Sequence, residues 1–299
     1  MSSPWIEGLR SVALSVPDLD QAEVFYTSVW RLEVAYRGID ALYLRGSGRD
    51  AYLLALYRRE GAPQILRVTL RARSPEALAQ VAKRAVEAGG DLVRAASPVE
   101  DPGGGVGILL RDPHGRVFEV VHGDGQREPA TSERDRPQRL THVVLNSHAV
   151  EETQTFLTRA FGMRLADRTA VIAFMNCNSD HHTLAIGISD NDALNHIAFL
   201  MPDGDAVMRG GGRMKDAGYP IQWGPGRHGP GNNLFNYFLD PFGIVIEYTS
   251  EVEQVDDSYT ARGPDDWKWP PGRVDQWGIS PAPGATLKEA QRRVLFAPL

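Results

Sequence analysis

An internal repeat is the feature that most limits how this chain can fold. The segment GLRSVALSVPDLDQAEVFYTSVWRLEVAYR at 8–37 has the same pattern as RLTHVVLNSHAVEETQTFLTRAFGMRLADR at 139–168. Each reads as a short apolar strand, a turn, an amphipathic helix and a second strand. Segments 65–98 and 194–226 repeat this pattern, with a Gly-containing stop after the helix. The chain is therefore expected to consist of two similar halves.

Each half closes with two strands joined by an Asp-Pro-x-Gly turn, LLRDPHGRVFEVV at 109–121 and YFLDPFGIVIEYT at 237–249. Four βαβββ modules account for this order. The predicted fold class is α+β, with two domains that are each a pair of βαβββ modules. The predicted boundaries are 1–125 for the first domain, 126–138 for a polar linker, 139–250 for the second domain and 251–299 for a tail rich in Trp and Pro.

Composition excludes several classes of partner. With 299 residues, 42% hydrophobic and 23% charged, the chain is long enough for two ordinary domains with their own cores. A net charge of −6 offers no broad basic surface for nucleic acid. No apolar run approaches the roughly 20 residues that a membrane span needs. Cys177 is the single cysteine, so no intramolecular disulfide can form, and a cytoplasmic protein is expected.

The repeat also serves as an internal control for residues that carry chemistry. Aligning the halves pairs three positions: His142 with Ser11, His196 with Arg67 and Glu247 with Glu119. Since the first half has no histidine at either place, the fold alone does not require one there. The glutamate is different, because Glu119 shows that this strand accepts a carboxylate without histidines nearby.

Two histidines and one carboxylate are the donor set of a facial metal site. His142 begins the strand HVVLN, His196 begins HIAFL, and Glu247 lies within the apolar run IVIEY. A buried glutamate is costly unless it is paired or binds a metal. This donor set leaves positions open and suits non-haem Fe(II), while Mn(II) and Zn(II) accept the same ligands. The alternative is a group of half-buried histidines beside a glutamate that reaches the surface.

Further polar residues lie close to these strands in the sequence. In DHHTLAI, strand alternation is expected to send one of His181 and His182 inward and the other outward. An inward histidine that binds no metal suits proton transfer near neutral pH. The phenol of Tyr237 can donate a hydrogen bond to an oxygen anion. Candidate pocket residues, each equally suited to the core, are Phe174, Met175, Asn176 and Trp223.

The order of these motifs resembles the type I extradiol ring-cleaving dioxygenases of the vicinal oxygen chelate superfamily. The resemblance rests on THVVLN, NSDHHTLAI, LNHIAFLM and GRH…NYFLDPFGIVIEY. At the level of the fold it covers about residues 5–250, and all chemical motifs lie within 139–250. It implies meta cleavage of a catechol-type vicinal diol in aromatic catabolism, with O₂ and non-haem Fe(II), or Mn(II) as the alternative metal. It also favours a homo-oligomer.

The resemblance assigns roles residue by residue. The implied metal ligands are His142, His196 and Glu247. His182 falls on the catalytic acid–base, and His228 and Tyr237 fall on the residues that hydrogen-bond the bound diol and oxygen. Further expected substrate contacts are Asn232, Phe174 and Trp223.

Two departures and two alternatives accompany this assignment. The family's acidic residue three positions after the histidine is Gly231 here, and the tail with Trp267, Trp269 and Trp277 has no counterpart in the pattern. One alternative is a related metal enzyme with glyoxalase, thiol-transferase or hydroxyphenylpyruvate dioxygenase chemistry. The other is a metal-free protein that sequesters an aromatic compound. The first does not need His182, His228 and Tyr237 together, and a complete set of two histidines and one glutamate with an acid–base histidine argues against the second.

Overall fold

The computed structural model describes residues 3–130 and 134–298, and it contains the four predicted βαβββ modules. The first half forms an eight-stranded sheet in the order β2-β3-β4-β1-β5-β8-β7-β6. Its elements are β1 (Ile6–Val16), α1 (Leu19–Val24), the π-helical turn η1 (Phe25–Val29), β2 (Glu33–Arg37), β3 (Ala41–Arg45), β4 (Leu54–Arg58), β5 (Gln64–Ala72), α2 (Pro75–Glu87), β6 (Asp91–Pro98), β7 (Val106–Arg111) and β8 (Val117–His122).

The second half repeats this order in a nine-stranded sheet, β10-β11-β12-β9-β13-β16-β15-β14, with β17 added beside β13. Its elements are β9 (Arg139–Ser147), α3 (Val150–Phe161), β10 (Arg164–Arg168), β11 (Ile172–Asn176), β12 (Leu184–Ile188), β13 (Ala193–Leu200), α4 (Gly204–Asp216), β14 (Trp223–Arg227), β15 (Leu234–Leu239), β16 (Val245–Ser250), α5 (Ala285–Ala290) and β17 (Val294–Leu295). The predicted α+β fold with paired modules is thus confirmed. Among the described helices, none has the length and apolar character needed to cross a membrane.

Short polar residues start three of the helices. Asp18 accepts hydrogen bonds from two backbone N–H groups of α1. Ser74 caps α2, which has a proline in its first turn, and Asp203 caps α4 in the same way. The second modules of the two halves therefore begin their helices in the same way, whereas α3, the counterpart of α1, has Ala149 at this place and no side-chain cap.

The strand registers confirm the alignment of the two halves at the candidate metal positions. Ser11 lies opposite Thr69 between β1 and β5, and His142 lies opposite Ala198 between β9 and β13. The last strands of the halves agree as well. Glu247 of β16 lies opposite Tyr237 of β15, and Glu119 of β8 lies opposite Leu109 of β7. The two halves therefore have the same strand pairing but carry different side chains at these positions.

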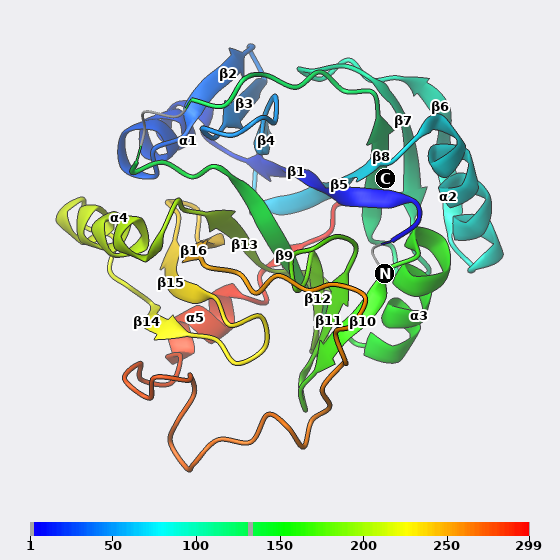
Figure 1. Cartoon of the computed structure of the whole chain (residues 1–299). Helices are drawn as coiled ribbons and strands as arrows, with labels where there is room; N and C mark the ends of the chain where they lie inside the picture. The colour runs from blue at the N-terminus through cyan, green and yellow to red at the C-terminus, as the bar shows by residue number, and fades with distance from the viewer. Residues whose placement is uncertain (1–2, 131–133, 299) are drawn as a thin grey trace.

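The two halves share one hydrophobic core, and helices lie at both ends of the seam between their sheets (Figure 1). Helices α2 and α3 pack against each other. At the other end Trp30, which follows η1, stacks on Tyr248 of β16 with ring centroids 3.6 Å apart, and the Tyr248 hydroxyl donates to the Trp30 carbonyl. The first half therefore supports the strand that carries Glu247.

The tail leaves β16, loops away from the second sheet and returns at α5 (orange to red in Figure 1). Trp267 and Trp269 pack against Gly229, and Gln276 donates a 2.6 Å hydrogen bond to the carbonyl of His228. After α5, β17 pairs with β13, and the backbone of Ala297 donates to Ile65 of β5. The tail therefore braces the loop around His228 and ties the two sheets together.

Candidate metal centre and its surroundings

His142, His196 and Glu247 come together on the second sheet from β9, β13 and β16. One ligand atom from each lies within 4.8 Å of the other two, and all three side chains are buried. Nε2 of His142 lies 3.3 Å and Nε2 of His196 lies 3.1 Å from Oε2 of Glu247. Two ligands about 2.1 Å from an ion and at right angles lie about 3.0 Å apart. The spacing therefore fits adjacent positions around one metal ion.

The carboxylate of Glu247 supplies an independent test of that fit. Its side chain is fully buried, and Oε2 has no hydrogen-bond partner among the described residues. Burial alone would raise the pKa of Glu247, but the adjacent imidazoles of His142 and His196 outweigh it and hold the pKa well below its usual range. A buried, ionised oxygen that faces two imidazole nitrogens has the chemistry of a metal ligand.

Each of the three ligands is held by an uncharged polar neighbour. The pairs are Thr141 with Nδ1 of His142 at 2.9 Å, Asn195 with Nδ1 of His196 at 2.8 Å, and Asn233 with Oε1 of Glu247 at 3.4 Å. With Nδ1 engaged, Nε2 of each imidazole is left as the ligand atom. Asn233 also donates to Thr249 at 2.7 Å, which fixes its amide beside the carboxylate.

His182, His228 and Tyr237 surround the cluster, as their sequence motifs suggested. The ring of His182 lies 4.3 Å from that of His142 between centroids. Nε2 of His228 lies 3.0 Å from the Tyr237 hydroxyl, which lies 3.4 Å from Nε2 of His196. The three polar groups therefore reach the same small volume as the candidate metal ligands.

Burial keeps these three side chains uncharged near neutral pH. Burial lowers the pKa of His182 well below its ordinary value, helped by the neighbouring His142 and His181. The pKa of His228 falls to about 4, mainly through burial. Burial and the charge of Glu247 raise the pKa of Tyr237 well above its usual range. Two neutral imidazoles and one protonated phenol therefore face the site.

The expected alternation of His181 and His182 is wrong. Both are buried, at 0% and 2% exposure, and they precede β12, which starts at Leu184. Outside a regular strand the period of two does not apply. Nδ1 of His181 instead lies 3.1 Å from Nδ1 of His182, and Nε2 of His181 lies 3.0 Å from Asp167.

Some of the other suggested pocket residues lie beside the site, and others do not. Phe174 packs edge-on against His182 with centroids 5.0 Å apart, and Trp223 lies 5.3 Å from His228. Asn232 points elsewhere: it is exposed, its φ is +48°, and its amide oxygen accepts from Gln276 of the tail. Met175 belongs to the core, and Asn176 donates to the carbonyls of Asn178 and Asp180.

Sequence reasoning did not predict the contact of Asn233 with Glu247. Gly231 has φ +80°, and its counterpart Gly103 in the first half has φ +94°. Two positions further on, Asn233 occupies the place of Gly105. The same comparison of halves that singled out the histidines would have identified it. Gly231 itself fits closely, because a Cβ there would lie 3.1 Å from the His182 ring.

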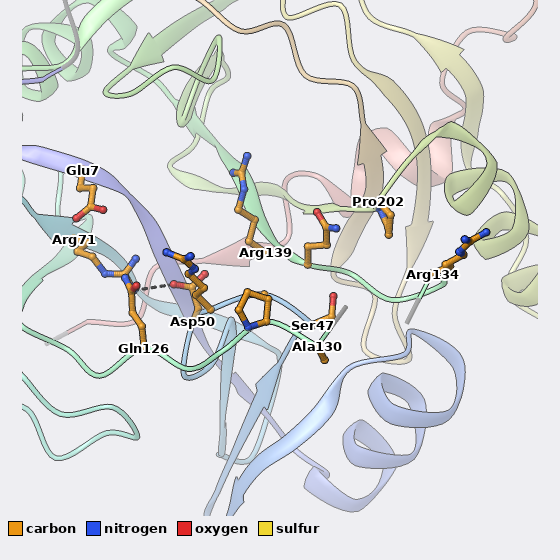
Figure 2. A pocket seen from close by; sticks show the side chains of 13 residues that line it. Glu7, Ser47, Asp50, Arg71, Gln126, Ala130, Arg134, Arg139 and Pro202 are labelled. Carbon is orange, nitrogen blue, oxygen red and sulfur yellow. Dashed lines mark hydrogen bonds and ion pairs between the residues drawn. The ribbon is translucent and has the colours of Figure 1, made fainter. Parts of the chain in front are cut away.

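A separate cavity of about 520 Å³ lies where β1, the linker segment and β9 meet (Figure 2). Arg71 there pairs with Asp50 at 2.8 Å, and Arg139 pairs with Asp180 at 2.7 Å. None of the candidate metal ligands or of the three polar groups around them is among the described residues that line it. The first ion pair lies within the first half and the second within the second half, and the cavity is distinct from the metal cluster.

Comparison with known proteins agrees with the two-domain fold. Residues 139–248 match the Glyoxalase/Bleomycin resistance protein/Dioxygenase superfamily, and residues 11–121 match a Glyoxalase-like domain. A solved structure named as the Mn(II)-bound glyoxalase from Novosphingobium aromaticivorans superposes with a TM-score of 0.87 at 32% identity. That match covers 96% of this chain and 94% of the other.

Two curated relatives are named as catechol-type dioxygenases. Metapyrocatechase 2 of Cupriavidus necator is 34% identical over 214 residues, which span 61% of this chain and 64% of the relative. A manganese-dependent 2,3-dihydroxybiphenyl 1,2-dioxygenase of Geobacillus genomosp. 3 is 23% identical over 254 residues, 77% of this chain and 80% of that one. The match thus spans less than two thirds of the metapyrocatechase. Together with the fold and both domain matches, these relatives confirm the resemblance seen in the motifs, and the chain belongs to the Glyoxalase/Bleomycin resistance protein/Dioxygenase superfamily.

Proposed function

We propose that the protein is an extradiol dioxygenase that opens the ring of a catechol-type aromatic vicinal diol with O₂. The metal would be a non-haem Fe(II) held by His142, His196 and Glu247. The observation that carries the proposal is the trio His182, His228 and Tyr237, all within reach of the same cluster. A Lewis-acid site needs the metal ligands alone, whereas diol cleavage needs groups that accept and donate protons beside them.

The donor set suits the proposed metal. When bound, Fe(II) at a site of two histidines and one carboxylate supplies open positions where a diol and O₂ meet, and it supplies redox chemistry between them. Mn(II) is the alternative, supported by the Mn(II) in the 32% identical structure and by the manganese-dependent relative. Among the described residues, the cluster contains only nitrogen and carboxylate ligands, which both ions accept.

The chain's own groups account for the proton chemistry. His182 is neutral, so it can take a proton from a substrate hydroxyl and return one later to the leaving oxygen. Tyr237 keeps its proton and can donate a hydrogen bond to an anionic oxygen. His228 lies 3.0 Å from that phenol and orients it.

Charge and shape are consistent with an aromatic diol. A divalent ion and one carboxylate leave a single positive charge in a buried site, and a diol that has lost one proton would balance it. Phe174 and Trp223 place aromatic faces beside His182 and His228, which suits the apolar part of a ring. By family resemblance, the enzyme would serve aromatic-compound catabolism in the cytoplasm as a homo-oligomer.

A glyoxalase activity is the second candidate, because the 32% identical structure carries that name. Such chemistry isomerises a thiol adduct of an aldehyde and consumes no O₂. A metal-free binding protein is the third candidate, and it would not need the orphaned oxygen of Glu247. Oxygen consumption and metal content separate the three.

The test measures O₂ uptake by anaerobically Fe(II)-loaded protein with diols from catechol to 2,3-dihydroxybiphenyl, together with the absorbance of a yellow product. We expect uptake that is lost in His182→Ala, with a drop in kcat on the order of 100-fold or more. His148→Ala is the matched control, because His148 is half exposed and pairs with Asp192 outside the site. Metal binding without turnover of any diol would contradict the proposal.

A further inference from the structure

Two asparagine amides connect the tail with the candidate metal ligand His196. Nδ1 of His196 lies 2.8 Å from Oδ1 of Asn195, and Nδ2 of Asn195 lies 2.9 Å from Oδ1 of Asn146. Nδ2 of Asn146 in turn lies 2.8 Å from the backbone carbonyl of Gln291, the residue that follows α5. These three hydrogen bonds, the amide network, therefore join the end of the tail helix to the imidazole that faces Glu247.

The carbonyl of Gln291 sets the direction of all three bonds. A backbone carbonyl only accepts, so Asn146 presents its NH₂ group to Gln291 and its oxygen to Asn195. Asn195 must then donate to that oxygen, which turns its own oxygen toward Nδ1 of His196. The reverse order would place the oxygens of Asn146 and Gln291 2.8 Å apart with no proton between them. Nδ1 of His196 therefore donates whether the ring is neutral or charged, and Nε2 is left facing the carboxylate.

The packing of α5 fixes the carbonyl at the end of the network. Leu287 and Ala290 of α5 are buried in one cluster with Tyr237 of β15. The last carbonyls of a helix have no partner within the helix, and the carbonyl that follows α5, that of Gln291, accepts from the buried Asn146. The position of α5 therefore determines where the first amide of the network lies.

The first half has the same backbone irregularity at this place but no amides. In both halves a β-bulge interrupts the pairing of the two central strands, and the extra residue is Asn195 in β13 and Leu66 in β5. The same registers align Asn146 of β9 with Ser15 of β1. Leu66 packs on an apolar cluster, so the fold accepts an apolar side chain at the bulge. The two amides occur at these positions only in the half with the metal cluster.

We propose that Asn195 and Asn146 are positioning residues that hold the ring of His196 with Nε2 toward the metal position, and that the tail sets their order through Gln291. With Nδ1 engaged, the ring does not rotate away, so a metal ion meets a ligand that is already in place. The inference rests on the proposed function in one respect, the role of His196 as a metal ligand. It requires no activity on a diol.

The decisive variant is Asn195→Leu, which places the first half's residue at the bulge. Leucine has nearly the same size as asparagine but no acceptor, so the ring of His196 loses the bond that orients it. We expect the dissociation constant for Mn(II) to rise by about 10- to 100-fold. Calorimetric titration of the metal-free full chain with Mn(II) measures it, after circular dichroism has shown that the variant is folded.

Asn191→Ala is the matched control. Asn191 donates to the carbonyl of Arg292, the neighbour of Gln291, and takes no part in the amide network. The variant therefore removes an amide that binds the same tail segment without touching the ligand. We expect its Mn(II) affinity to equal that of the wild type.

A spectroscopic signal distinguishes positioning from a purely structural role. In ¹⁵N-histidine-labelled protein loaded with diamagnetic Zn(II), the Nδ1 proton of His196 should be protected from exchange with water, because it is bonded to Asn195. In Asn195→Leu the same proton should exchange rapidly. A role confined to stability would leave both the exchange of this proton and the metal affinity unchanged.

A second variant tests whether the two amides act together. Asn146→Ser places the first half's residue at the other amide and removes the link to Gln291, so the metal affinity should fall, but less than in Asn195→Leu. In the double variant we expect no loss beyond that of Asn195→Leu, because both amides reach the metal through one bond to His196. Losses that multiply would overturn the network, since they would show two independent effects.

The outcomes separate this inference from the proposed function. Unchanged Mn(II) affinity in a folded Asn195→Leu overturns the inference, even if the wild type consumes O₂ with a diol. If that variant does not fold, the wild type decides, because a His196 Nδ1 proton that exchanges freely with water overturns the inference as well. Reduced affinity in a protein that cleaves no diol would support the positioning role and reject the dioxygenase.

Discussion

The two halves of the molecule solve one electrostatic problem in different ways. Both bury a glutamate at the same register of the last strand, Glu119 in β8 and Glu247 in β16. In the first half Arg67 pairs with Glu119 at 3.2 Å and with Asp101 on its other side. In the second half the position of Arg67 is His196, and an oxygen of Glu247 has no hydrogen-bond partner among the described residues. A buried carboxylate on this strand needs a cation beside it. In the first half the cation is an arginine side chain, and in the second half the site has room for a metal ion.

The largest effect should come from placing an arginine in the second half at the position that Arg67 occupies in the first. In His196→Arg the guanidinium can pair with Glu247, as Arg67 pairs with Glu119. We expect a folded protein that has lost bound metal and all measurable O₂ uptake, because a ligand is replaced by a cation in the metal's place. Elemental analysis and oxygen-electrode measurements check this. Retained stoichiometric metal would mean that His196 is not a ligand.

The converse change tests whether Arg67 is needed by the first half. Arg67→Met removes the cation that Asp101 and Glu119 share, and leaves the buried Glu119 with Arg94, 2.8 Å away, as its remaining cation. Breaking such a pair from one side should lower the free energy of unfolding by about 3 kcal/mol, measured by urea denaturation of the metal-loaded protein. The double variant Arg67→Met/Glu119→Gln should recover part of the loss. A single variant as stable as the wild type would remove the parallel between the halves.

A smaller effect is expected where the two Asp-Pro-x-Gly turns differ. Asp112 pairs with the buried Arg116 at 2.7 Å, whereas Asp240 accepts from the Tyr26 hydroxyl and from the backbone of Phe242 and Ile244. Burial raises the pKa of Asp240 to about 7. A raised pKa means that the folded state holds this proton more tightly than the unfolded state does.

The contribution of Asp240 to stability is therefore fully present below the unfolded pKa of about 3.9 and is lost as the pH rises through about 7. In Asp240→Asn the amide does not titrate. We expect the Tm advantage of the wild type over this variant to shrink by a few degrees between pH 5 and pH 8. Thermal unfolding followed by circular dichroism at both pH values measures it, and a constant difference would argue against a raised pKa.

Much of the fold was predictable because the same sequence pattern occurs in both halves. Hydrophobic periodicity, the helix caps and the Asp-Pro-x-Gly turns are local signals, and each appears in both halves. The convergence of His142, His196 and Glu247 followed from the same alignment, since equivalent strands carry equivalent registers. The roles of these residues rest on chemistry that the proposed experiments test.

The features that could not be predicted from the sequence lie in segments without regular periodicity. His181 and His182 lie before β12, so strand alternation could not assign their directions. Asp167, Tyr259 and the tail meet only through tertiary contacts between distant parts of the chain. The family's acidic residue cannot simply be restored at Gly231, because its φ of +80° and the nearby His182 ring leave little room for a side chain.

The backbone bond between Ala297 and Ile65 has a consequence for how the protein is made. Ile65 is the second residue of β5 in the first half, and β17, just before Ala297, pairs with β13 of the second. Synthesis runs from the N-terminus, so the strands of both sheets are made before this segment. A nascent chain arrested before residue 294 would lack this contact between the two sheets. The pairing of β17 with β13 and the bond from Ala297 to Ile65 thus form only after the strands of both sheets have been made.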